Sequence, residues 1–153
     1  MPASTALYYP FLKGHTPMTT MSVQLRSIPD TQAAIGWADG HTIVVDRPGG
    51  KAGGMGLGFN GGQLLGLAIG GCFCNDLHYV AHDMGIRLAS IAVDVTVAFE
   101  GNPLIAKSAS LRVAVSATDK GADVSGVIRR AQEISAVSNS IKRGIAVQFV
   151  AND

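Results

Sequence analysis

Residues 56–73 read GLGFNGGQLLGLAIGGCF, a glycine-rich turn that continues directly into an apolar segment. Eleven of the chain's 19 glycines fall between residues 49 and 71, with leucine, isoleucine and phenylalanine interleaved among them. From Gly62 to Met84 the apolar residues recur at intervals of three and four, which predicts a long helix that stops at Gly85. This stretch therefore predicts a central helix entered through an unusually glycine-rich approach.

Strands are predicted on both sides of this helix along the chain. Before it, three short strands cover residues 22–26, 33–38 and 41–46, and Asp39-Gly40 predicts a hairpin turn between the last two. After it, apolar and polar residues alternate over two half-buried strands, residues 91–99 and 109–117. A second helix is expected from Asp123 to Gly144, followed by a last strand over residues 145–149.

This order of elements has no βαβ rhythm, so the predicted fold class is α+β. The length of 153 residues suits one domain, which we assign to residues 22–153. Residues 1–21 are interpreted as an N-terminal extension whose Tyr8, Tyr9, Phe11 and Leu12 dock on another surface.

Charge and composition exclude several classes of partner. A net charge of +1 without a Lys/Arg cluster argues against binding to nucleic acid or to an anionic membrane. The apolar run over residues 64–73 is too short to span a bilayer, and no secretion signal is recognised. Two cysteines in a chain of this size predict reduced thiols and a cytoplasmic location. Only 15% of the residues are charged, which predicts surface hidden in an obligate oligomer.

Residues 56–61 also match the pattern G-x-G-x-x-G of dinucleotide-binding loops. That reading requires a strand directly before the loop and a parallel strand with an acidic residue after the helix. The predicted strand ends early, at Asp46, and an antiparallel hairpin follows the helix. We therefore expect no cofactor, and interpret the loop as mobile or as backbone that passes close to another element.

Cys72 lies in the middle of the predicted helix, beside Gly70 and Gly71. Two glycines inside a helix cost roughly 1 kcal/mol each relative to alanine, which predicts close packing against a second helix. Cys72 is either a small buried apolar residue or a redox thiol. The redox interpretation needs a cation or hydrogen-bond donors nearby, because the middle of a helix offers no help from its dipole.

Cys74, His78 and His82 form a stripe at i, i+4 and i+8, and thiolate and imidazole are ligands that zinc and copper prefer. The ends of the stripe are about 12 Å apart along the helix, so at most two of these side chains could share one metal. Solvated surface histidines are the simpler interpretation, and we predict no metal site.

The run from Gly56 to Phe73 resembles the OsmC/Ohr family (osmotically inducible protein C and organic hydroperoxide resistance). That family reads G-x-G-x-N-P-E-[EQ]-L, then seven residues, then C-F. The resemblance continues through Tyr79-Val80-Ala81 and Gly85-Ile86, and resumes at Val137-Ser138-Asn139. It implies an intertwined homodimer whose two central helices cross in the core. It also implies reduction of small apolar hydroperoxides by a cysteine pair, an arginine oriented by a glutamate, and turnover by dithiols.

The chain departs from the family at two of these positions. The glutamate falls on Gly62 and the second cysteine falls on Ser135, which leaves Cys72 as the nucleophile. The activating arginine is Arg26 by order along the chain, with Arg47 as the other candidate. Cys74 could take over as resolving thiol only if the helix unwinds locally, because residues two apart point roughly 200° from each other.

Two hypotheses follow for the function. One is a single-cysteine hydroperoxide reductase with Cys72, Arg26 and Cys74 as its candidate catalytic residues and an external dithiol as reductant. The other is a protein of the same fold that binds a small ligand without turnover, with Cys72 as a structural residue.

Overall fold

The computed structural model describes residues 18–151 and has the predicted α+β fold, so residues 1–17 of the predicted extension lie outside it. Its elements in chain order are β1 (Gln24–Ser27), β2 (Ala34–Ala38), β3 (His41–Val45), α1 (Gly61–Asp83), β4 (Leu88–Glu100), β5 (Ile105–Ala117), α2 (Val124–Ile134) and α3 (Ala136–Arg143). The central helix differs from its predicted bounds by one residue at each end, and Gly85 follows it with φ +67°.

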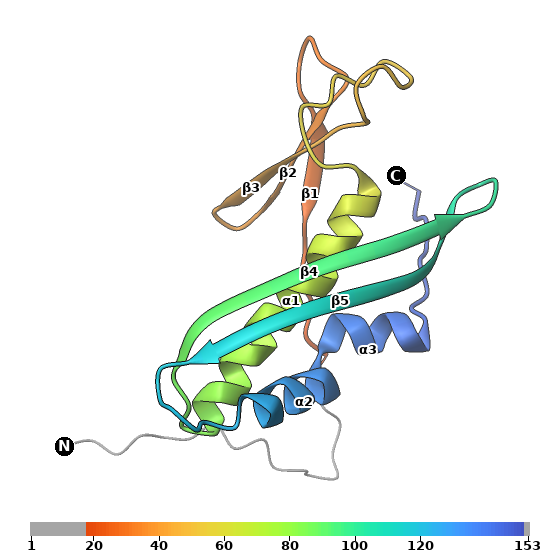
Figure 1. The fold of residues 1–153 in the computed structure, drawn as a ribbon. Coiled ribbons are helices and arrows are strands. Elements are labelled where there is room, and N and C mark those ends of the chain that lie inside the picture. The colour runs from red at the N-terminus through yellow and green to blue at the C-terminus, as the bar shows by residue number, and fades with distance from the viewer. Residues whose placement is uncertain (1–17, 152–153) are drawn as a thin grey trace.

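The strands form two separate antiparallel sheets. β1, β2 and β3 make a three-stranded sheet in which Ala38 pairs with His41, confirming the Asp39-Gly40 hairpin. β4 and β5 make one long hairpin, longer at its open and closed ends than the alternating pattern predicts. Figure 1 shows the small sheet near the N-terminal end of α1, while the long hairpin crosses the helix lower down.

The core lies where α1, α2 and the inner face of the long hairpin meet. Leu77 of α1 and Val127 and Ala131 of α2 have no exposed surface, and Phe73, Val80 and Ala81 complete the buried cluster. The inward-facing side chains of the hairpin pack against this cluster, among them Ile91, Val93, Leu111, Val113 and Val115. The alternating apolar pattern of the hairpin therefore supplies one wall of the core and leaves its other face to solvent.

The glycine-rich approach is tied to the small sheet just before α1 begins. The Phe59 backbone N–H donates to the Val44 carbonyl at 3.0 Å, and the Asp46 N–H donates to the Phe59 carbonyl at 3.1 Å. A Cβ atom at Gly58 would collide with that Val44 carbonyl. Close passage of backbone, the second interpretation of this loop, is therefore confirmed at Gly58.

Three sequence predictions are corrected. The helix predicted from Asp123 to Gly144 is two helices, because Ser135 adopts ψ 105° and interrupts it. Residues 145–149 form no strand, and their apolar side chains are exposed because no described strand pairs with them. Gly70 packs on β4 rather than on a second helix, since a Cβ there would lie 2.9 Å from Val95 Cγ2.

α1 is also longer than the apolar run over residues 64–73 on which the membrane argument rested. It is the one helix in the described part of the chain that is long and apolar enough to cross a membrane. The core helix of a soluble protein passes the same test, and α1 buries Phe73, Leu77 and Val80 in the core. Packing within the chain buries 39% of the apolar window and therefore accounts for part of its apolar character.

Candidate functional site

Cys72 lies at the centre of α1 as a free, partly buried thiol. Its Sγ lies 3.5 Å from Asp76 Oδ2 and donates a hydrogen bond to it. The spacing of four residues places the two side chains on the same helix face. Asp76 is only 8% exposed, although carboxylates are rarely buried without a partner. The thiol and the carboxylate therefore form a close pair on α1.

Cys74 faces a different region. It is a free, partly buried thiol that lines a groove of about 680 Å³ between α1 and β4. Phe59, Leu67, Val95 and Phe99 are among the other side chains that line this groove. Because the helix is continuous through both residues, a disulfide between Cys72 and Cys74 would require the centre of α1 to unwind.

The structure places the two candidate arginines in the N-terminal part of the fold, on and beside the small sheet. The Arg26 guanidinium donates to the Leu25 carbonyl at 2.8 Å and lies 5.8 Å from the centre of the Trp37 ring, within cation–π range. Arg47 Nη2 donates to the carbonyl and side-chain oxygens of Gln32 at 3.2 and 3.1 Å. Within residues 18–151 neither guanidinium contacts Cys72, so one chain by itself does not bring the predicted pair together.

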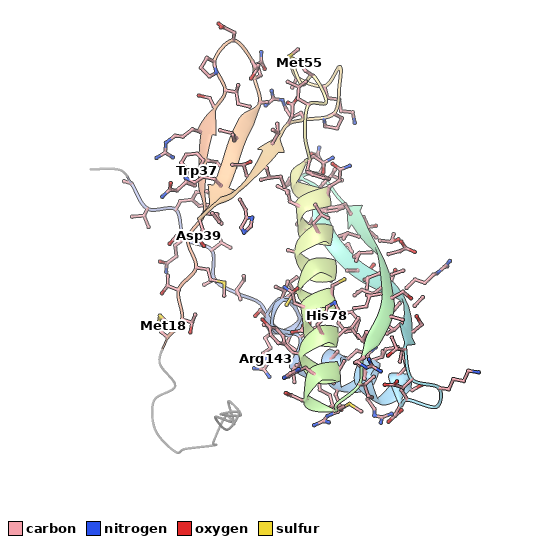
Figure 2. The ribbon with its side chains drawn as sticks, turned by 90° about the vertical axis from the view of Figure 1, so that its left-hand side faces the viewer. Met18, Trp37, Asp39, Met55, His78 and Arg143 are labelled. Carbon is pink, nitrogen blue, oxygen red and sulfur yellow. The ribbon has the colours of Figure 1, made fainter. Side chains whose placement is uncertain are left out.

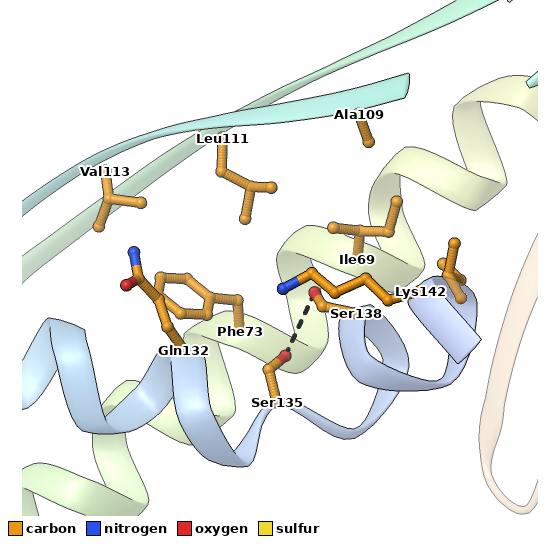
Figure 3. Close-up of a pocket in the computed structure, with 10 residues that line it drawn as sticks. Ile69, Phe73, Ala109, Leu111, Val113, Gln132, Ser135, Ser138 and Lys142 are labelled. Atoms are coloured by element: carbon orange, nitrogen blue, oxygen red, sulfur yellow. Dashed lines mark hydrogen bonds between the residues drawn. The ribbon is translucent and has the colours of Figure 1, made fainter. Parts of the chain in front are cut away.

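Ser135, where the resemblance places a second cysteine, lies at the junction between α2 and α3. It is 1% exposed, and its hydroxyl donates to the Ser138 hydroxyl at 3.4 Å. Figure 3 shows both serines at the edge of a cavity between α1, β5 and the last two helices. The cavity has a volume of about 410 Å³, and Ile69, Phe73, Leu111 and Val113 give it apolar walls. Gln132 and Lys142 are its other polar lining residues.

Gly62, where the resemblance places the glutamate, has little room for a side chain. A Cβ atom there would lie 3.1 Å from two ring carbons of Phe99 and 3.3 Å from Asn60 Oδ1. Contacts this short require the phenyl ring to move. The ring of Phe99 on β4 thus occupies the space in which a glutamate side chain at position 62 would begin.

The histidines of the proposed metal stripe are exposed on α1, where Figure 2 labels His78. Residues 18–151 contain no cluster of three or more His, Cys, Asp or Glu side chains that could hold a metal ion.

Sequence reasoning missed two buried aspartates, Asp76 beside Cys72 and Asp46, which holds the glycine-rich loop. Asp46 is buried and accepts hydrogen bonds from the backbone N–H groups of Arg47, Met55 and Leu57 at 2.7, 3.0 and 3.0 Å. The Leu57 hydrogen bond is the largest cause lowering the pKa of the Asp46 carboxyl below its ordinary value of 3.8, while burial opposes it. The sequence could have indicated Asp76, because this residue lies four positions after Cys72 on a predicted helix and therefore on the same helix face.

Comparisons with known proteins agree with this architecture. The family model of OsmC-like proteins matches residues 53–150. An OsmC-like protein from Mycoplasma pneumoniae has a similar fold, with a TM-score of 0.67 at 16% identity over 81% of this chain and 88% of its own. An organic hydroperoxide resistance protein from Legionella pneumophila gives 0.55 at 20% identity, over 83% and 92% of the two chains.

OhrB of Bacillus subtilis, also an organic hydroperoxide resistance protein, gives a TM-score of 0.55 at 19% identity, over 81% of this chain and 91% of its own. At such identities the likeness shows the fold alone. No curated protein is similar enough in sequence to match this chain.

Proposed function

The chain belongs to the OsmC-like protein family, and we propose that it reduces organic hydroperoxides through one cysteine, Cys72, with an external thiol as reductant. The observation that carries the proposal is the position of Cys72, a free and partly exposed thiol at the centre of the long helix of this fold. The similar solved structures include organic hydroperoxide resistance proteins, which supports the choice of substrate class.

The chemistry needs only one cysteine. Cys72 sulfur attacks the terminal oxygen of the hydroperoxide, so that an alcohol leaves and a sulfenic acid remains on the protein. One thiol of an external dithiol then forms a mixed disulfide and releases water. Its second thiol displaces Cys72 and restores the reduced enzyme. Because a serine stands at position 135, the external reductant attacks the sulfenic acid itself rather than a protein disulfide. A cytoplasmic location, where thiols are kept reduced, suits this cycle.

The chain is proposed to work as a homodimer. Its accessible surface is 12618 Å². A compact protein of this mass exposes about 7,300 Å², and nineteen fully extended residues would add at most about 3,000 Å². The chain by itself therefore exposes more surface than a compact monomer would. On α1, Leu67 and Tyr79 are 50% and 67% exposed, and a Cβ at Gly71 would meet no atom within 4 Å. A second copy packed on this face would cover these residues and could bring Arg26 to Cys72.

The test is sulfenic acid formation. Purified, reduced protein is mixed with cumene hydroperoxide and dimedone, and the labelled residue is identified by mass spectrometry. We expect one dimedone adduct on Cys72 and none in Cys72→Ser. No adduct under conditions that oxidise free cysteine would overturn the proposal. An adduct that forms only after Cys74→Ser would show that Cys74 resolves the sulfenic acid, which contradicts a single-cysteine cycle.

A second candidate function rests on the cavity beside Ser135. Its apolar walls and few polar groups are typical of a small-molecule site, and Cys72 does not line it. In this case the protein binds an apolar ligand without turnover. Cumyl alcohol, the unreactive counterpart of cumene hydroperoxide, should then raise the melting temperature. Leu111→Trp, which fills the cavity, should abolish that shift.

A further inference from the structure

We propose that Asp76 is the acid–base residue of Cys72, taking the thiol proton as sulfur attacks and delivering it to the departing alcohol oxygen. This inference rests on the proposed function, since it assigns a second catalytic residue to the same reaction. It answers a question that the departures from the family pattern raise. The carboxylate that would orient an arginine is replaced by Gly62, and the carboxylate that does contact Cys72 is that of Asp76.

A cysteine nucleophile can be activated in two ways. A nearby cation can hold it as the thiolate, or an adjacent base can remove its proton during the attack. In the described part of the chain, no cationic side chain forms a hydrogen bond or an ion pair with Cys72 or Asp76. The partner that Cys72 does have is a carboxylate, at 3.5 Å from Sγ. A carboxylate oxygen at this distance from Sγ is well placed to accept the thiol proton as sulfur attacks.

The surroundings of Asp76 agree with this role. Its carboxylate is largely withdrawn from water, and Cys72 is its only hydrogen-bond donor among the residues that the structure describes. A structural carboxylate in such a place usually accepts several strong hydrogen bonds, as Asp46 does from three backbone N–H groups. Asp76 instead keeps acceptor capacity and faces a single reactive atom.

The step balances with the substrate alone. The S–H bond of Cys72 breaks and its proton goes to Asp76 Oδ2, while sulfur bonds to the terminal hydroperoxide oxygen and the O–O bond breaks. The alkoxide that leaves takes the proton from Asp76. Sulfur is oxidised to the sulfenic acid and the peroxide is reduced to the alcohol, and Asp76 returns to its carboxylate form.

The test compares two reactions of Cys72 in wild type and Asp76→Asn at neutral pH, with Cys72 modification quantified by mass spectrometry. Both reactions require Cys72 to lose its thiol proton, but iodoacetamide then releases iodide, which needs no proton, whereas cumene hydroperoxide releases an alkoxide that does. In Asp76→Asn we expect oxidation to slow by at least about a hundredfold. Alkylation should slow less than oxidation, because it loses the base that takes the thiol proton but needs no proton on its leaving group. Asp83→Asn, which removes an exposed carboxylate from the same helix, should change neither rate.

The other outcomes overturn the proposal in distinguishable ways. If wild type is oxidised but Asp76→Asn is oxidised as fast or faster, Asp76 acts only through its charge. If both reactions slow equally, Asp76 does not deliver a proton to the departing oxygen and the acid–base role is wrong. If wild type itself resists oxidation, the proposed function fails and the acid–base role fails with it. Should Asp76→Asn not fold, Asp76→Ser provides the same comparison with a smaller neutral side chain.

Discussion

Asn60 and Gln63 cap the start of α1 reciprocally. The Gln63 backbone N–H donates to Asn60 Oδ1 at 3.0 Å, and the Asn60 backbone N–H donates to Gln63 Oε1 at the same distance. These are two of the matched residues in the motif that carries the family resemblance. Their role here is structural, since the capping box fixes where the helix of Cys72 begins.

Removing this cap should destabilise the protein without altering its chemistry. Asn60→Ala should lower the free energy of unfolding by about 1 kcal/mol, because a backbone N–H of the first turn loses its acceptor. Urea unfolding at a fixed protein concentration measures the change. Asn60→Asp keeps an acceptor at this position and serves as the control. Equal stability of Asn60→Ala and wild type would show that the cap contributes nothing.

The proposed dimer makes a prediction at Gly71. In one chain a Cβ there meets nothing, and alanine is a better helix former than glycine. If a second copy of α1 crosses at this point, Gly71→Ala overpacks the crossing by about 1–3 kcal/mol, which weakens the dimer about 5- to 160-fold. Sedimentation equilibrium measures the dissociation constant. Gly61→Ala changes an equally open glycine at the start of α1 and should leave the dissociation constant unchanged. Equal dissociation constants for Gly71→Ala and Gly61→Ala would contradict the crossing.

Local patterns predicted most of the fold. The 3–4 spacing of apolar residues gave α1 nearly to the residue, and Asp39-Gly40 gave a hairpin, because both depend on neighbouring residues. Contacts between distant residues were not readable. The partner of Gly70 proved to be a strand, and residues 145–149 alternate like a strand but have no described strand to pair with. The break at Ser135 was also missed, because no glycine or proline marks it.

In the site, too, the sequence indicated what depends on neighbouring residues and not the contacts between distant ones. Cys72 was identified from its motif, and the carboxylate of Asp76 lies one helical turn away, at a spacing that the sequence displays. The role of Asp46 could not be read, because two of its three donors, Met55 and Leu57, lie in a loop that returns to it nine and eleven residues further along the chain. Within residues 18–151 Arg26 does not contact Cys72, and no sequence pattern encodes the distance between two residues so far apart in the chain.

Asp46 predicts how stability depends on pH. Hydrogen bonds from the loop lower its pKa in the folded state below the ordinary value of 3.8, so the ionised carboxylate stabilises the fold. This contribution to stability is complete at a pH above the pKa that Asp46 has in the unfolded chain. It is lost as the pH falls through the lower pKa that Asp46 has in the folded protein. Asp46→Asn should therefore melt below wild type at neutral pH, and the difference should shrink as the pH drops below 3.8.

Thermal unfolding across pH measures this difference. Asp119→Asn, which removes an exposed carboxylate paired with Arg87 at 3.0 Å, is the matched control and should change the melting temperature little. A constant difference between Asp46→Asn and wild type down to strongly acidic pH would show that the charge of Asp46 is irrelevant.

Ser135→Cys should convert the proposed single-cysteine cycle into a two-cysteine cycle. Ser135 is buried at the junction of α2 and α3 and lines the same cavity as Phe73, the residue that follows Cys72, although Cys72 itself does not line this cavity. After one equivalent of cumene hydroperoxide, the introduced thiol should attack the Cys72 sulfenic acid, releasing water and forming an intramolecular disulfide. Intact mass should then fall by two hydrogens, and dimedone should no longer label Cys72. Persistent dimedone labelling, with no disulfide, would mean that the introduced thiol cannot reach Cys72 and that the serine does not occupy the place of a resolving cysteine.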